Sequence, residues 1–153
     1  MTANNKKHLE LNFNLIIKKK FEIVDGYAEI PLLNNDTFVA VMVDEGIEVS
    51  NLANSPLLKW KVFEEIERLF IEKGPKVQKG NAMHYKLGES GLPKDSIEGR
   101  VAEKVYYKEE GDSVFRRISP ITGILRWAGI CKSIPDSGYI KLVEYLQKKL
   151  YLK

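Results

Sequence analysis

The chain has 153 residues, a net charge of +3 at pH 7, 44% hydrophobic residues and 29% charged residues, which is ordinary globular composition. No apolar run approaches the roughly 18 residues that a membrane-spanning helix needs, and the first ten residues lack the apolar core of a secretory signal. The single cysteine, Cys131, excludes an internal disulfide. We therefore expect a soluble, cytoplasmic protein.

The first fifty residues predict an antiparallel β meander. Leu11, Phe13, Leu15 and Ile17 alternate with polar or less buried neighbours, which is the period of a half-buried strand. Asp25-Gly26 separates two short runs and indicates a hairpin turn, and a second turn is expected at 34–36. The strands are expected at 11–17, 21–24, 27–30, 37–43 and 47–49. We assign them to an N-terminal module of residues 1–52.

The rest of the chain predicts helices followed by a hairpin. Ser55-Pro56 is typical of a helix start, and Gly74-Pro75 ends that helix. Three further helices are expected at 80–87, from Asp95 or Ser96 to about Tyr107, and from Ser119-Pro120 to Gly129. Two strands, at 130–131 and 139–143, and an amphipathic C-terminal helix complete the prediction.

Three helices and a hairpin follow one another in the order of a winged helix. We therefore predict an α+β protein, in which an N-terminal antiparallel β meander precedes a winged-helix-like domain at residues 53–153. That domain would contain three to four helices and a β-hairpin wing.

Positive charge is concentrated in the second part of the chain. Residues 1–50 contain five lysines against eight acidic residues, whereas residues 51–153 contain nineteen Lys and Arg against thirteen. Residues 113–141 contain five basic residues and a single acidic one, Asp136. A local basic excess is what a protein needs to bind a polyanion, although charge alone fits an ordinary solvated face better.

The fourth predicted helix has the pattern of a DNA-recognition helix. Its apolar stripe, Ile118, Ile121, Ile124, Leu125 and Ala128, is expected to pack inward. The remaining face would then fit a major groove, where Arg can bind guanine and Ser or Thr can bind phosphate. The DNA contacts that we expect from the helix and the residues before it are Arg116, Arg117, Ser119, Thr122 and Arg126. The wing would add Lys132, Tyr139 and Lys141.

A set of positions along this segment matches a known family pattern. An aromatic residue and an Arg stand at the start of the helix, a Leu, an Ala-Gly and an aliphatic residue stand at its end, and a Gly-Tyr and a Leu-x-Glu follow. These are Phe115, Arg117, Leu125, Ala128-Gly129-Ile130, Gly138-Tyr139, Leu142 and Glu144. The segment thereby resembles the N-terminal winged-helix DNA-recognition domain of Mrr-type restriction endonucleases, over residues 56–144. Pro120 departs from the family, whose helix has no proline there.

The nuclease part of that family has no counterpart here. Its metal site needs an acid-x-Lys arrangement, and no lysine in the chain has Asp or Glu two residues before it. His8 and His84 are isolated, and Cys131 is expected to be a small core residue. We therefore expect no catalytic residue, no metal and no cofactor.

The resulting hypothesis is a non-catalytic regulatory protein that binds double-stranded DNA. The competing hypothesis is a protein–protein docking module, since a fold does not determine a function. An enzyme of unrecognised type, acting between the two predicted parts, is a third and weaker possibility. Trp127, which lies off the apolar stripe, is expected either to pack under the β module or to belong to a partner surface.

The C-terminal segment bears on oligomeric state. Its apolar positions at near-helical spacing predict either a homodimer contact or a helix folded back onto its own domain. These positions are Leu142, Tyr145, Leu146, Leu150 and Tyr151.

Overall fold

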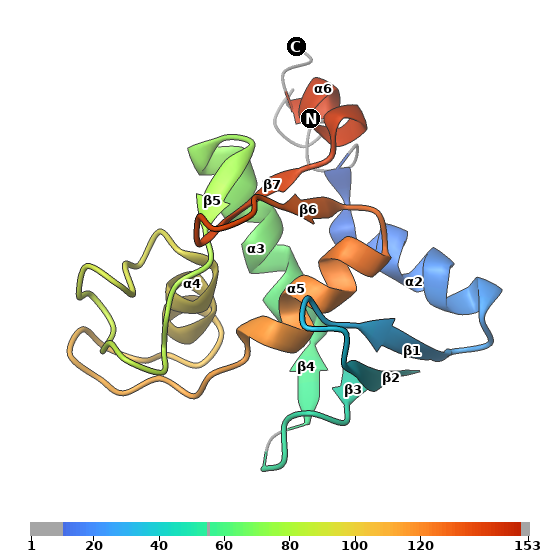
Figure 1. Ribbon diagram of the computed structural model, residues 1–153, viewed down its shortest axis with the longest axis horizontal. Coiled ribbons are helices and arrows are strands. Elements are labelled where there is room, and N and C mark those ends of the chain that lie inside the picture. The colour runs from blue at the N-terminus through green and yellow to red at the C-terminus, as the bar shows by residue number, and fades with distance from the viewer. Residues whose placement is uncertain (1–10, 55, 151–153) are drawn as a thin grey trace.

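The computed structural model describes residues 11–54 and 56–150, which form a mixed α+β fold (Figure 1). A four-stranded antiparallel sheet lies on one side of the molecule and a small three-stranded antiparallel sheet on the other. The described helices are α2 (Phe13–Ile23), α3 (Trp60–Lys73), α4 (Ile97–Lys104), α5 (Ile118–Trp127) and α6 (Glu144–Leu150). The predicted α+β class is confirmed at this level.

The strands predicted at 11–17 and 21–24 are wrong, because these residues form α2. Phe13, Ile17 and Phe21 recur every four residues and are the buried side of that helix. Over so short a segment the same apolar residues satisfy both the strand period and the helical period. Asp25 and Gly26, with φ of 57° and 80°, lead out of the helix instead of joining two strands.

The predicted meander is confirmed from residue 27 onward. It consists of β1 (Tyr27–Pro31), β2 (Thr37–Val43), β3 (Gly46–Val49) and β4 (Leu57–Lys59), each paired antiparallel with the next. The helix predicted from Ser55-Pro56 starts later, because residues 57–59 pair with β3. Ser55 itself lies outside the described residues.

The helical region also differs from the prediction in two places. Residues 80–87 form turns instead of a helix, within a long loop between β5 (Lys76–Gln78) and α4. Helix α4 is capped by Ser96, as one of the two alternatives proposed, but it ends at Lys104. Helix α5 begins at Ile118, so that Pro120 stands in the first turn, where a backbone N–H has no partner within the helix.

The small sheet joins β5 to the hairpin of β6 (Cys131–Ser133) and β7 (Tyr139–Leu142), in the order β5-β7-β6. The predicted hairpin is thus confirmed, and β5 adds a third strand that the sequence did not suggest. Gly129, with a φ of 76°, directs the chain out of α5 into β6.

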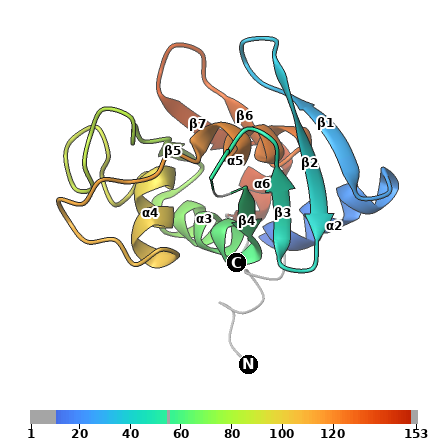
Figure 2. The same cartoon turned by 90° about the horizontal axis from the view of Figure 1, so that it is seen from below.

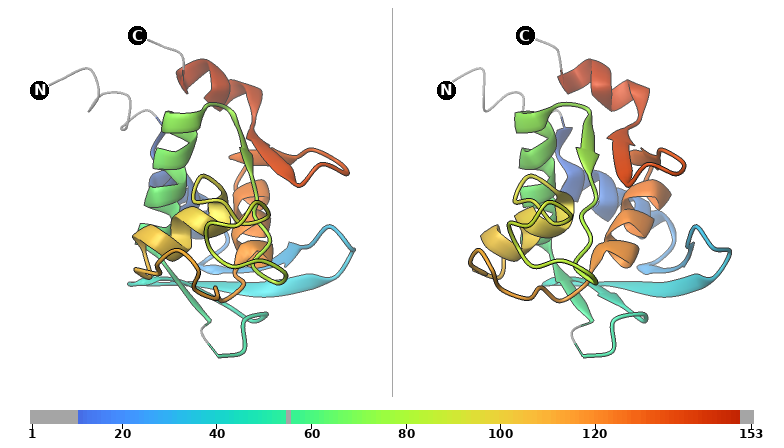
Figure 3. Two further views of the ribbon diagram at one scale, coloured as in Figure 1. Left: turned by 90° about the vertical axis from the view of Figure 1, so that its left-hand side faces the viewer. Right: turned by 60° about the vertical axis from the view of Figure 1, so that its left-hand side comes forward.

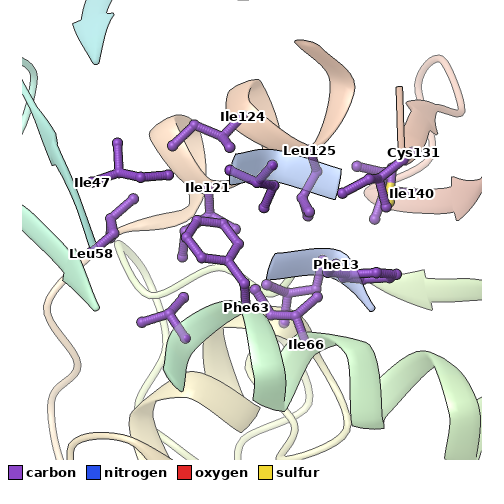
Figure 4. Packing of buried hydrophobic residues seen from close by; sticks show 14 of the residues in the cluster. Phe13, Ile47, Leu58, Phe63, Ile66, Ile121, Ile124, Leu125, Cys131 and Ile140 are labelled. Carbon is purple, nitrogen blue, oxygen red and sulfur yellow. The ribbon is translucent and has the colours of Figure 1, made fainter. Parts of the chain in front are cut away.

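One hydrophobic core contains residues from both predicted parts of the chain. Ile47 and Leu58 of the four-stranded sheet pack near Phe63 of α3 and Ile121 of α5 (Figure 4). Ile121, Ile124 and Leu125 are fully buried as predicted, and Ala128 is partly buried. Trp127 also packs against this core, with its ring centroid 4.7 Å from that of Phe21.

The C-terminal stripe folds back onto its own chain. Leu142, Leu146 and Leu150 are buried in the core, Tyr145 is exposed, and Tyr151 lies outside the described residues. The surface on which the dimer prediction rested is therefore largely covered, and a dimer stays a prediction. Among the described helices, none is long and apolar enough to cross a bilayer.

Two helices begin at buried glutamates that belong to other helices. Glu67 of α3 accepts the backbone N–H of Phe13 at 2.8 Å, and Glu98 of α4 accepts that of Arg117 at 2.9 Å. Carboxylates at helix N-termini satisfy unpaired N–H groups and favour the helix dipole. These contacts join α2 to α3 and α5 to α4, and the second of them positions the helix on which the candidate site depends.

Candidate nucleic-acid interface

Helix α5 lies between two β-turns that project to the same side of the molecule. One turn joins β1 to β2 and the other joins β6 to β7, and both protrude beyond α5 (Figures 2 and 3). The four-stranded sheet covers one side of α5: a Cβ at Gly123 would meet the ring of Phe38. The accessible part of α5 is therefore a recessed strip between the two turns.

Two of the residues predicted on the outer face of α5 are buried, and these predictions are wrong. The Arg117 guanidinium lies between two rings, 3.8 Å from the centroid of Tyr106 and 4.7 Å from that of Phe115. The Thr122 hydroxyl donates to the carbonyl of Ile118 at 3.0 Å. Arg117 is thus covered by rings of the segment between α4 and α5, and Thr122 bonds within its own helix, although Thr122 still contributes to the lining of the pocket beside α5.

Three other predicted residues share the recessed strip. Arg116 is exposed, Ser119 and Arg126 are partly buried, and all three line one pocket beside α5. The Arg126 Nη1 is buried without a hydrogen-bond partner among the described residues. Burial lowers the pKa of the Arg126 guanidinium from its ordinary value. The structure thus brings together part of the predicted helix face, although in a recess and not on a ridge.

The wing residues lie on the outer face of the small sheet. Lys141 of β7 stands directly opposite Lys132 of β6 on one side and Lys76 of β5 on the other. Directly opposed residues of an antiparallel sheet point to the same face, so these three lysines, here called the basic row, lie side by side. Tyr139 shares this face, with its ring centroid 5.1 Å from the Lys76 Nζ.

Lys132 and Lys141 were predicted from the sequence, but Lys76 and the alignment of all three were not, because the members of the basic row come from three separate strands. Lys76 belongs to a strand of three residues, and its register against β7 is a tertiary property. Lys79, at the end of the same segment, was also not expected, and it lines the pocket together with Arg126. Burial and the neighbouring Arg126 lower the pKa of the Lys79 ammonium from its ordinary value.

Within the part of the chain that the structure describes, the cations of this region have no acidic partners. Among residues 11–54 and 56–150, no carboxylate lies within 4.0 Å of a nitrogen of Arg116 or Arg126, of the basic row, or of Lys79. Four cations of α3, α4 and the loop before it, namely Arg68, Lys73, Lys94 and Arg100, each pair with a carboxylate.

The pocket beside α5 has a volume of about 700 Å³. Its walls come from α5, the end of β5, the loop that follows, the β1–β2 turn and Gly138 of the wing. His84 also lines this pocket. Within the described residues no group of three His, Cys, Asp or Glu could hold a metal ion, and burial raises the pKa of the Cys131 thiol.

Comparison with family models, with curated proteins and with solved structures found no match to this chain. The resemblance to the DNA-recognition domain of Mrr-type endonucleases therefore stays a prediction. What the site can do must be argued from its own geometry and charge.

Proposed function

We propose that this chain is a non-catalytic DNA-binding protein that uses the basic row and the accessible edge of α5. The observation that carries the proposal is the basic row itself: Lys76, Lys141 and Lys132 stand in register across three strands without an acidic partner among the described residues. Like charges directly opposed on a sheet destabilise it. A polyanion that neutralises them supplies the missing compensation, with release of counterions from the DNA.

The order of elements supports a winged-helix-like arrangement for this region. Helices α3, α4 and α5 are followed by the β6–β7 hairpin, and β5, between α3 and α4, pairs with β7. In this assignment α5 is the recognition helix and the β6–β7 turn is the wing. The four-stranded sheet is an addition to this arrangement, and it narrows the exposed part of α5.

That narrowing has a consequence for how DNA would be bound. Because the β1–β2 and β6–β7 turns protrude beyond α5, they would meet a duplex before the helix could enter a groove (Figure 3). We infer that phosphate contacts dominate, from Lys132, Lys141 and Arg116, with little direct contact to bases. Binding of this kind is strongly salt-dependent and only weakly dependent on sequence.

The test is the affinity for a labelled duplex, measured by fluorescence anisotropy over a salt series. Each neutralised phosphate contributes about −0.9 to the slope of log K against log salt. We expect Lys141→Gln and Lys132→Gln each to weaken binding and to reduce the magnitude of the slope by about one. Lys94→Gln is the matched control, because it removes the same charge from a lysine that pairs with Glu103 and Glu110. Equal effects of Lys94→Gln and Lys141→Gln would contradict the proposal.

The docking-module hypothesis is favoured by one specific observation. The β1–β2 turn and the loop after β5 expose Leu33 and Met83, at 65% and 60% of their surface. Apolar side chains that are exposed beside a pocket are typical of protein interfaces. A chain that shows no salt-dependent binding to any duplex, with intact folding, would leave docking as the better explanation.

A further inference from the structure

The pocket beside α5 combines unpaired positive charge with an aromatic wall. Three cations, Arg116, Arg126 and Lys79, line it, and no Asp or Glu does so among the described residues. The side chains of Lys79 and Arg126 are both partly buried, so that water compensates their charges incompletely. Two cations in one recess without a carboxylate are costly unless an anion joins them.

The second observation is the placement of Tyr85. Its ring lies against the backbone of Gly91, where a Cβ would overlap the ring atoms. The ring can occupy this position because Gly91 has no side chain. Tyr85 still has 40% of its surface exposed and lines the pocket. An aromatic side chain in the lining of a pocket is a surface on which a planar group can stack.

The loop that carries Tyr85 is held in place before any ligand binds. The Tyr85 backbone N–H donates to the carbonyl of Asn81 at 3.2 Å, and Asn81 in turn donates to the carbonyl of Gly91 at 2.9 Å. Leu87 and Leu92 of the same loop are buried in a small cluster of their own. A surface that is ordered in advance binds a planar group at a lower entropic cost than a mobile one.

From these observations we propose that the pocket binds one nucleotide, with its phosphate at Arg126 and Lys79 and its base stacked on Tyr85. The nucleotide can be a free mononucleotide or a nucleotide within a DNA strand, since the chemistry that the pocket recognises is the same. The first source goes beyond the proposed function, whereas the second rests on it.

The direct test compares four probes by calorimetry: the four deoxynucleoside monophosphates, the corresponding deoxynucleosides, inorganic phosphate, and a duplex. We expect the monophosphates to bind at least tenfold more tightly than either inorganic phosphate or the nucleosides, because only they satisfy both halves of the pocket. Equal affinity for inorganic phosphate and the monophosphates would overturn the proposal, as would the absence of any monophosphate binding.

Variants separate the two halves of the pocket. We expect Arg126→Gln to weaken both monophosphate and phosphate binding, and Tyr85→Leu to weaken monophosphate binding about tenfold while leaving phosphate binding unchanged. Gly91→Ala should reproduce Tyr85→Leu, because it displaces the ring. The control Tyr145→Leu changes an exposed tyrosine on α6 and should have no effect. Thermal unfolding of each variant checks that it folds, and a folded Tyr85→Leu variant with unchanged monophosphate affinity would refute the base subsite.

Oligonucleotide binding then identifies the source and keeps the two proposals apart. If the nucleotide belongs to DNA, Tyr85→Leu should weaken binding of a single-stranded oligonucleotide about tenfold at constant salt slope, because an unpaired base is free to stack on the ring. If it is a free ligand, Tyr85→Leu should weaken monophosphate binding about tenfold while the affinities for the oligonucleotide and the duplex stay as in the parent. Duplex binding that depends on the basic row, with no monophosphate binding and no effect of Tyr85→Leu, would refute the pocket proposal and leave the DNA proposal intact. Monophosphate binding without any duplex binding would do the reverse.

Discussion

Charged side chains are arranged in opposite ways in two regions of this molecule. On α3 and α4, Arg100 donates two hydrogen bonds to Glu72, at 2.8 and 3.2 Å, and a third to the buried Glu65, at 3.1 Å. On α5 and the small sheet, cations stand beside other cations. The two regions share one core, so that burial alone does not explain the difference.

The difference indicates what each set of charges does. A buried charge that is paired and fully hydrogen-bonded is part of the folded structure, and its removal leaves its partner uncompensated. An unpaired set of like charges adds little to the structure and can lower its stability. We therefore expect substitutions in the first region to change the free energy of unfolding, and substitutions in the second to change binding.

The largest effect is expected at Arg100. Arg100→Leu removes a bidentate partner of Glu72 and leaves Glu65, which is buried, with Arg68 alone. Breaking such a network by removing one partner costs about 3–5 kcal/mol in the free energy of unfolding. Denaturant unfolding at pH 7 measures this loss directly.

The double variant Arg100→Leu, Glu65→Leu sharpens that test. Replacing both buried partners with apolar residues removes the uncompensated charge, so that much of the lost stability should return. DNA affinity, where present, should be unchanged in every folded variant of this pair. A loss below about 1 kcal/mol for Arg100→Leu would show that the network does not stabilise the fold.

The next largest effect concerns Glu98, which connects the two regions. Burial raises the pKa of its carboxyl to about 7, against the hydrogen bond from the Arg117 backbone and the nearby Arg117 charge. The folded state thus binds a proton that the unfolded state releases near pH 4.5. Between pH 4.5 and 7 this group makes stability fall as the pH rises. A difference of this size corresponds to about 3 kcal/mol.

Glu98→Gln removes this titration and keeps an oxygen that can accept the Arg117 N–H. We expect the variant to be at least as stable as the parent at pH 8, and to lose that advantage progressively as the pH falls to 5. Unfolding by urea at four pH values gives the difference in the free energy of unfolding between the two proteins. The contributions of the other titrating groups cancel in this difference. A parent that is more stable than Glu98→Gln at pH 8 would contradict the raised pKa.

Much of the fold could be predicted from local pattern. The strands at 27–30, 37–43 and 47–49, the core positions of α5 and the β6–β7 hairpin follow from periodicity and turn residues. The error at residues 11–24 has a definite cause. Phe13, Ile17 and Phe21 have helical spacing, but Leu15 continues an alternating pattern that made this spacing hard to recognise. In the structure Leu15 is exposed. Lys18, Lys19 and Lys20 then follow within the same helix, between the two segments that had been expected to form separate strands.

The candidate site was predictable only in part, because its geometry is tertiary. Arg116, Ser119 and Arg126 share one pocket, but nothing local showed that Tyr106 and Phe115 would cover Arg117 or that Thr122 would be buried. The basic row depends on strand register, and the Tyr85 surface depends on a contact with Gly91 in an irregular loop. Contacts of both kinds join residues that no sequence period connects.

The smallest expected effect compares the two regions most directly. Removal of one lysine charge should change the free energy of unfolding in opposite directions in them. Lys141→Thr removes the central charge of the basic row and places a β-branched residue on β7. At low salt this should raise the free energy of unfolding by about 0.5 kcal/mol, since it relieves two cross-strand repulsions. Lys94→Gln removes the same charge from a lysine paired with Glu103, and should lower the free energy of unfolding slightly or leave it unchanged. Added salt screens both charge interactions, so that the part of each effect that comes from charge should disappear above about 0.5 M, and only the contribution of the β-branched side chain should remain. Chemical unfolding at a series of urea concentrations, repeated at low and high NaCl, resolves the sign. If Lys141→Thr destabilises the protein at low salt, partners within the chain stabilise the charges of the basic row. These charges then need no ligand to compensate them.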